Sequence, residues 1–216
     1  MADEPKVEAS GPGGRGYGVW GALAFVVLAF GSALYLQGQG AGKGVAPGGV
    51  QPAAIAAPAL KGLNSGEMAA FLFSSAPTAV PAIAFKDADG KDLNLEAWRG
   101  KVLLLNLWAT WCAPCRQEMP ALDKLKAELG GKDFDIIALS TDRGGLDKPR
   151  KFWVDVGIKA LGLYIDSNDA QHQLNVIGLP TTLLIDRTGH EIGRLIGPAD
   201  WASPEAKALL LAAIRG

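Results

Sequence analysis

The stretch NLWATWCAPCRQEMP, residues 106–120, decides the fold, because it joins an apolar run to a helical pattern through two cysteines. The apolar run, residues 101–108, contains VLLLNLW and predicts a buried central strand. Apolar side chains then recur at helical spacing and predict a helix over residues 113–129. The sequence therefore places Cys112 and Cys115 where a buried strand meets the first turn of a helix.

Strand and helix patterns alternate along the rest of residues 63–216. We expect further strands at residues 82–85, 92–95, 134–140, 161–165, 181–186 and 191–196, and helices at residues 148–157, 170–174 and from Pro204 onward. Asn64 or Ser65 is expected to cap a short helix that runs to about Phe73, as an N-terminal extension of this domain. The alternation predicts an α/β domain with a mixed central sheet flanked by helices.

The first 62 residues fall into three segments of different composition. Residues 1–18 are mostly small and polar and predict a disordered tail. Residues 19–36 carry no charge, and a helix of that length spans about 27 Å, close to the hydrocarbon thickness of a bilayer. Residues 37–62 are rich in Gly, Ala and Pro and predict a flexible linker.

The uncharged run at residues 19–36 has three interpretations. A buried core helix disagrees with the linker that follows, and a cleaved signal peptide would use the weak small-residue site at residues 31–33. We predict the third, an uncleaved transmembrane anchor that precedes the α/β domain. Lys6 and Arg15 lie before the run and Lys43 after it, which favours a cytoplasmic location for the tail at residues 1–18.

Charge and cysteine counts exclude several classes of protein. The net charge is -1, from 21 basic and 22 acidic residues, whereas a nucleic-acid binder needs a basic face. Two cysteines cannot form a disulfide-dense scaffold or a four-cysteine zinc site. We therefore expect no nucleic-acid partner and turn to what one cysteine pair does.

The cysteine pair has the spacing of a redox centre. A sulfur at a helix N-terminus lies at the positive end of the helix dipole, which stabilises the thiolate, the species that attacks disulfides. A zinc site would need His172 and His190, which lack finger spacing, and a copper site would combine both cysteines with one histidine. A merely structural bridge between Cys112 and Cys115 closes a very small loop and gains little stability. Redox catalysis is the interpretation we favour.

Two motifs of this sequence resemble the thioredoxin superfamily. WATWCAPC (108–115) is similar to its active-site motif, and GLPTT (178–182) is similar to the cis-proline loop that packs beside the cysteines in that superfamily. DADGK (87–91), WRGK (98–101) and CRQEMP (115–120) narrow the resemblance to the TlpA/ResA-like branch, and GPADWAS (197–203) is most similar to its TlpA group. The resemblance covers residues 63–216 and implies a thioredoxin-like fold.

The resemblance implies a role for each matching residue. Cys112 matches the attacking cysteine and Cys115 the buried resolving cysteine, while Glu118 matches a glutamate that tunes the acidity of the cysteines. Glu118 lies one turn beyond Cys115 on the same helix, so it either accepts a proton from Cys115 or is a solvated helix charge. Asn106 stands where ordinary thioredoxin carries a buried aspartate, so proton handling must come from elsewhere.

The substrate-binding residues also follow from the resemblance. The backbone of Leu179, before cis-Pro180, is expected to pair with an extended substrate segment. Trp111 shields the sulfurs or contacts partners, and Pro114 lies between the cysteines in the first turn of the helix. The polar connection from Asp142 to Pro149 is a candidate for shaping the choice of partner.

These residues predict a membrane-anchored thiol:disulfide oxidoreductase that needs no metal or organic cofactor, and the resemblance implies that it acts as a reductant of protein disulfides. We expect a single-pass protein of the inner (cytoplasmic) membrane with its catalytic domain in the periplasm and a membrane electron donor that re-reduces it. The resemblance implies copper chaperones or oxidase subunits as substrates, in assembly of the cytochrome oxidase copper centre. The alternatives are a reductant of apocytochrome c and a copper-binding metallochaperone. A thiol peroxidase would need a P-x-x-x-T-x-x-C motif, which this sequence lacks.

Overall fold

The computed structural model describes residues 60–216. The predicted tail at residues 1–18, the transmembrane anchor at 19–36 and all but the end of the linker at 37–62 lie outside the described residues. Within residues 60–216, no helix is both long enough and apolar enough to span a bilayer.

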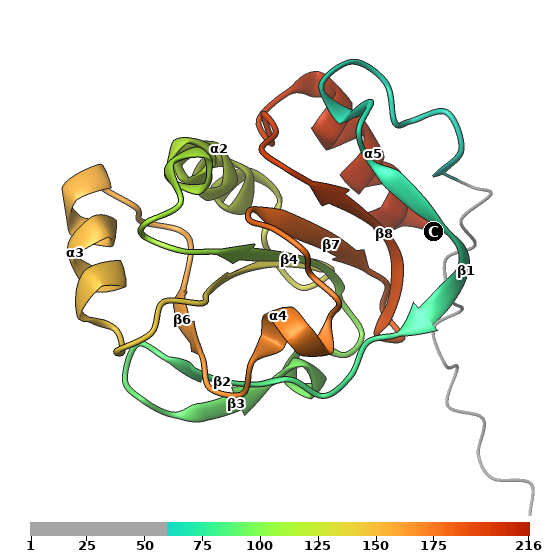
Figure 1. Cartoon of the computed structure of the whole chain (residues 1–216). Helices are drawn as coiled ribbons and strands as arrows, with labels where there is room; N and C mark the ends of the chain where they lie inside the picture. The colour runs from blue at the N-terminus through green and yellow to red at the C-terminus, as the bar shows by residue number, and fades with distance from the viewer. Residues whose placement is uncertain (1–59) are drawn as a thin grey trace, which may run out of the picture. The chain divides into compact units, whose positions relative to one another are not determined.

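The described residues form one mixed sheet with helices on both faces (Figure 1). The sheet has eight strands in the order β1-β8-β7-β4-β5-β6-β2-β3, and β4 pairs in parallel with β5 and antiparallel with β7. The strands are β1 (Leu72–Ala79), β2 (Ala84–Asp87), β3 (Asp92–Asn94), β4 (Val102–Trp108), β5 (Phe134–Ser140), β6 (Leu163–Asp166), β7 (Thr181–Ile185) and β8 (His190–Ile196). The helices are α2 (Ala113–Leu129), α3 (Asp147–Val156), α4 (Ala170–Gln173) and α5 (Pro204–Arg215), with 3-10 turns η2 (Gly66–Met68) and η3 (Leu95–Trp98). The predicted α/β class is confirmed.

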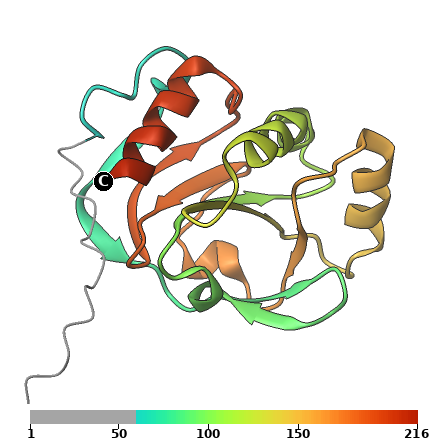
Figure 2. The same ribbon diagram turned by 180° about the vertical axis from the view of Figure 1, so that it is seen from behind.

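Strand β4 runs through the centre of the sheet and divides two hydrophobic clusters. All seven of its residues are buried, and because side chains alternate along a strand, its two sets of apolar residues enter different clusters. Leu104 and Trp108 face α2 and α5, whereas Leu105 and Leu107 face α4. Figure 2 shows α2 and α5 on one face of the sheet and α4 on the other. Asn106 has the same parity as Leu104 and Trp108, so it points toward α2.

The N-terminal part of the domain differs from the prediction. The helix expected from Asn64 or Ser65 to about Phe73 is only the 3-10 turn Gly66–Met68, and strand β1 follows it and pairs with β8. Asn64 does not cap a helix, because its side-chain amide donates to the Phe71 carbonyl over 3.1 Å. Strand β1 lies at the sheet edge with mostly exposed side chains, so its sequence lacks the alternation that reveals a strand.

Candidate active site

Cys112 and Cys115 form a disulfide at the start of α2, with their Cα atoms 5.3 Å apart. Cys112 is the N-cap of the helix, and its sulfur accepts a hydrogen bond from the Cys115 backbone N–H over 3.3 Å. Pro114 is the second helical residue, where no hydrogen bond of the helix is lost. Cys112 is 5% exposed and Cys115 is 0% exposed, so Cys112 is the sulfur that another molecule reaches first.

The predicted cis-proline loop lies next to this helix start. The Leu179–Pro180 peptide bond is cis, and β7 begins directly after it. Thr181 pairs with Leu107 near the end of β4, the strand that leads into the cysteines. Leu179 is partly buried against the cluster that contains both cysteines, and the Pro180 carbonyl accepts the Gly197 N–H over 2.8 Å. The fold thus brings residues 112–115 and 179–180 into one site.

Two large apolar side chains are exposed on the loops of this site. Trp111, directly before Cys112, is 71% exposed, so most of its surface is available to a partner. Ile177, directly before Gly178, is 87% exposed, and the sequence analysis did not single it out. Trp108 is buried and stacks on Trp153 with ring centroids 5.1 Å apart, as a core residue does.

Glu118 is a buried acid held by three donors from two other segments of the chain, strand β4 and residues 197–203. It is 3% exposed, which excludes the solvated helix charge. One carboxylate oxygen accepts the Asn106 side-chain amide of β4 over 2.8 Å. The other oxygen accepts the Ala199 backbone N–H and the Trp201 indole N–H, each over 3.3 Å. All three donors are neutral, so no cation balances the charge of the carboxylate through these bonds.

Burial raises the pKa of Glu118 to about 7, while the hydrogen bonds from Asn106, Ala199 and Trp201 act in the opposite direction. Cys115 and Glu118 are three residues apart on α2, so they share one face of the helix. A carboxyl with this pKa is suited to take up and release a proton at neutral pH. Asn106 also donates to the Thr182 hydroxyl over 2.9 Å, so it positions Glu118 and does not replace the aspartate as a base.

Asp142 fastens the loop that carries the cysteines to strand β5. Its carboxylate accepts the backbone N–H of Thr110 over 2.8 Å, the Thr110 hydroxyl over 2.6 Å and the Ser140 hydroxyl over 2.8 Å. Asp142 begins the connection that was predicted as a candidate for shaping partner choice, whereas the residue is buried. The sequence carried a signal for this contact, because Thr110 follows β4 and Asp142 follows β5, and the carboxyl ends of two parallel strands meet at one edge of the sheet.

Possible metal ligands are dispersed over the part of the chain that the structure describes. No group of three or more His, Cys, Asp or Glu side chains lies close enough there to hold a metal ion. His172 is in α4, and His190 begins β8 with its ring nitrogen 2.8 Å from the Thr188 hydroxyl.

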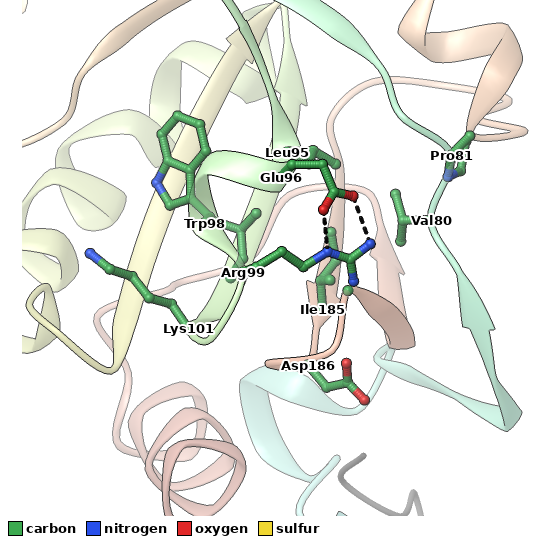
Figure 3. A pocket seen from close by; sticks show the side chains of 11 residues that line it. Val80, Pro81, Leu95, Glu96, Trp98, Arg99, Lys101, Ile185 and Asp186 are labelled. Carbon is green, nitrogen blue, oxygen red and sulfur yellow. Dashed lines mark hydrogen bonds and ion pairs between the residues drawn. The ribbon is translucent and has the colours of Figure 1, made fainter. Parts of the chain in front are cut away.

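A small pocket lies at the opposite end of β7 (Figure 3). Its volume is about 20 Å³, enough for about one water molecule. Arg99 extends across it and donates to both oxygens of Glu96, over 2.9 and 2.7 Å. Asp186, which follows β7, lies below Arg99 in this view. The pocket contains none of the predicted site residues and is too small for a substrate.

Comparisons with known proteins agree with this geometry. The Redoxin family model matches residues 75–210, more than half of the chain. The thiol-disulfide oxidoreductase ResA of Bacillus cereus is 32% identical over 126 residues, which cover 54% of this chain and 67% of ResA. The thioredoxin-like protein YneN of Bacillus subtilis is 35% identical over 109 residues, which cover 50% of this chain and 64% of YneN.

Solved structures show the same similarity. A thiol:disulfide interchange protein of the DsbE type from Chlorobium tepidum superposes with a TM-score of 0.58 and 27% identity, over 64% of this chain and 96% of that protein. A thiol-disulfide oxidoreductase from Bacteroides vulgatus gives a TM-score of 0.54 and 29% identity, over 62% of this chain and 94% of that protein. The chain therefore belongs to the Redoxin family, as a thioredoxin-like thiol-disulfide oxidoreductase that fits the TlpA/ResA-like branch.

Proposed function

We propose that this chain is a membrane-anchored reductant of protein disulfides whose catalytic domain faces the periplasm. The observation that carries the proposal is the Cys112–Cys115 bridge at the N-terminus of α2, beside cis-Pro180 and one turn from a buried acid. The uncharged run at residues 19–36 supports the anchor, and basic residues before it support a cytoplasmic N-terminus. A disulfide-based cycle also suits an oxidising compartment.

The reaction starts from the reduced pair. The Cys112 thiolate attacks one sulfur of a substrate disulfide, the substrate S–S bond breaks, and the second substrate sulfur leaves as a thiolate that takes a proton from water. The Cys115 thiol then gives its proton to the Glu118 carboxylate, and the resulting thiolate attacks the Cys112 sulfur of the mixed disulfide. The first substrate sulfur leaves, the Cys112–Cys115 bond forms, and the substrate has gained two electrons.

The exposed side chains on the two loops suit a protein substrate. Trp111, directly before Cys112, and Ile177, two residues before Leu179, offer exposed apolar surface. The Leu179 backbone is proposed to pair with an extended segment of the substrate. A small disulfide compound would contact little of this surface. We therefore propose a polypeptide with an accessible disulfide as the substrate.

Each cycle leaves the cysteines oxidised, and this chain contains no third cysteine. Another molecule must therefore open the bridge and supply two electrons. An anchored domain meets such a donor most readily at the membrane, so we propose a membrane protein as the electron donor.

Among possible substrates we favour copper chaperones or oxidase subunits, during assembly of the cytochrome oxidase copper centre. The support for this choice is the resemblance of the GPADWAS segment (197–203) to the TlpA group, which implies such substrates. Apocytochrome c is a second candidate, because several matched relatives are ResA proteins. An alternative function for this chain is a copper-binding metallochaperone, which predicts that the purified chain carries stoichiometric copper.

Trapping in cells tests the proposal. The full chain with Cys115→Ser should accumulate mixed disulfides with its substrates, because the sulfur that resolves them is absent. Captured copper-binding proteins would support the favoured substrate class, and captured apocytochrome c would overturn it in favour of the second candidate. The double variant Cys112→Ser with Cys115→Ser is the control and should capture neither.

A further inference from the structure

Glu118 is fixed to a segment of the chain that has no role in the chemistry described above. We infer that Trp201 is a positioning residue for Glu118: its indole N–H, with the Ala199 backbone N–H, stabilises the charged carboxylate that receives the Cys115 proton. This inference rests on the proposed function, because it concerns the proton acceptor of that cycle. It adds a residue that lies 83 positions from Glu118 in the sequence.

The two oxygens of the Glu118 carboxylate have different donors. Its Oε1 accepts only from Asn106, whereas Oε2 accepts from Ala199 and Trp201. Trp201 is 0% exposed and belongs to the larger hydrophobic cluster, together with both cysteines. A buried indole N–H needs an acceptor, and a buried carboxylate needs donors, so each group satisfies the other.

The segment that carries Trp201 is fixed at both ends. At one end the Gly197 N–H donates to the Pro180 carbonyl over 2.8 Å. At the other end Ser203 caps α5 by accepting the Ala206 N–H over 3.2 Å. The backbone that carries the indole is therefore held by the cis-proline loop and by α5, and the ring packs in the larger hydrophobic cluster.

The other titratable groups around Glu118 are few. Strands β4 and β7 carry no titratable side chain, and on α2 the residue one turn before Glu118 on the same face is Cys115, which does not titrate while it is disulfide-bonded. In the segment itself Asp200 is exposed, and Glu205 at the start of α5 lies against Gly66. A change in the titration of Glu118 after loss of the indole N–H thus reports the hydrogen bond itself.

The chain offers a matched control in Trp108. This residue is also 0% exposed in the same cluster, but its indole N–H has no hydrogen-bond partner among residues 60–216. Replacing either tryptophan by phenylalanine removes a similar volume from the same core. The two variants differ in whether a hydrogen bond to Glu118 is lost.

The test follows the protonated carboxyl band of Glu118 by infrared spectroscopy of the oxidised full chain in detergent, as a function of pH. The band is assigned by its absence in Glu118→Gln. The wild-type midpoint is expected near pH 7. Trp201→Phe should move the midpoint up by about one to two pH units, the equivalent of one hydrogen bond to a charged group. Trp108→Phe should leave it in place.

Equal midpoints in the two phenylalanine variants would overturn the inference, as would equal shifts in both. Should Trp201→Phe not fold, benzothienylalanine at position 201 keeps the bicyclic shape without the N–H, and the same upward shift is expected. The titration needs no turnover, so it stands apart from the proposed function. Absence of disulfide exchange in the wild type would overturn that function and leave this measurement unaffected.

Discussion

Glu118 on α2 and Asp186 directly after β7 are both buried carboxylates, and they are held in opposite ways. Asp186 accepts the Thr188 N–H over 2.9 Å, the Thr188 hydroxyl over 2.7 Å and the His190 N–H over 2.9 Å, all within its own hairpin turn. Glu118 accepts from positions 12, 81 and 83 residues away. Asp186 therefore stabilises a local turn, whereas the donors to Glu118 are brought together by the tertiary structure.

Their neighbours differ as well. Asp186 lies near the Arg99 guanidinium and keeps one oxygen without a hydrogen-bond partner among the described residues. Glu118 has only neutral donors and lies one turn from a reactive cysteine. Burial alone therefore does not distinguish a functional acid from a structural one. The origin of the donors and the group within reach make the distinction.

The largest difference in turnover between the cysteine site and the region around Asp186 is expected from the variants Cys112→Ser and Arg99→Ala. Cys112→Ser removes the attacking sulfur and should abolish disulfide exchange, measured as turnover of a protein disulfide by the pre-reduced chain. Arg99→Ala breaks an exposed ion pair with Glu96 and should leave turnover unchanged. Residual turnover in Cys112→Ser would refute the assignment of the attacking cysteine.

Glu118→Gln and Asp186→Asn compare the two carboxylates directly. Glu118→Gln cannot take the Cys115 proton, so resolution of a preformed mixed disulfide at pH 7 should slow by about a hundredfold, the typical size of one acid–base contribution. Asp186→Asn should retain the wild-type rate. Stopped-flow release of the substrate thiol measures both, and equal slowing in the two variants would remove the functional distinction.

The pH dependence of stability gives a third comparison. The pKa of Glu118 rises from 4.5 to about 7 on folding, so the folded chain binds this proton more tightly than the unfolded chain. Stability is therefore lost as the pH rises from about 4.5 to about 7, by about 3 kcal/mol, and no further loss from this group follows above that range.

Urea unfolding of the oxidised chain at pH 4 and pH 8 checks this dependence. Glu118→Gln has no proton to lose, so its free energy of unfolding should fall by about 3 kcal/mol less than that of the wild type between these conditions. The same fall in both proteins would show that Glu118 does not titrate in this range.

The smallest change in activity is expected from a substitution of an exposed side chain near the active site. Ile177→Ser removes an apolar contact to a bound polypeptide and should lower kcat/KM for a protein substrate by about fivefold, which corresponds to about 1 kcal/mol. Val154→Ser on α3 removes a comparably exposed side chain, 81% against 87%, and should not change kcat/KM. A small aromatic disulfide should be reduced equally by both variants.

The sequence predicted the centre of the molecule better than its edges. The strand before Cys112, the helix after it and the loop at cis-Pro180 were recognisable, because apolar periodicity and the motif residues are local signals. Strand β1 was not predicted, because most of its side chains are exposed and its partner β8 is more than a hundred residues away. An exposed edge strand leaves no hydrophobic pattern to read.

The reactive residues of the site were predicted, but the hydrogen bonds that position them were not. Glu118 was recognised through the family resemblance, which its spacing from Cys115 supports, but its burial and its donors depend on how residues 197–203 pack against α2. Asp142 likewise acts on Thr110 across two parallel strands. Contacts of this kind join positions far apart in the chain, and periodicity within one segment carries no information about them.

The unequal exposure of the two sulfurs has a kinetic consequence. Cys112 is 5% exposed and Cys115 is 0% exposed, so the electron donor must attack the same sulfur that later attacks the substrate. Donor and substrate then occupy one face in turn and exclude each other. The enzyme is therefore expected to follow a ping-pong scheme, in which double-reciprocal plots at several donor concentrations are parallel and an excess of either protein inhibits the other.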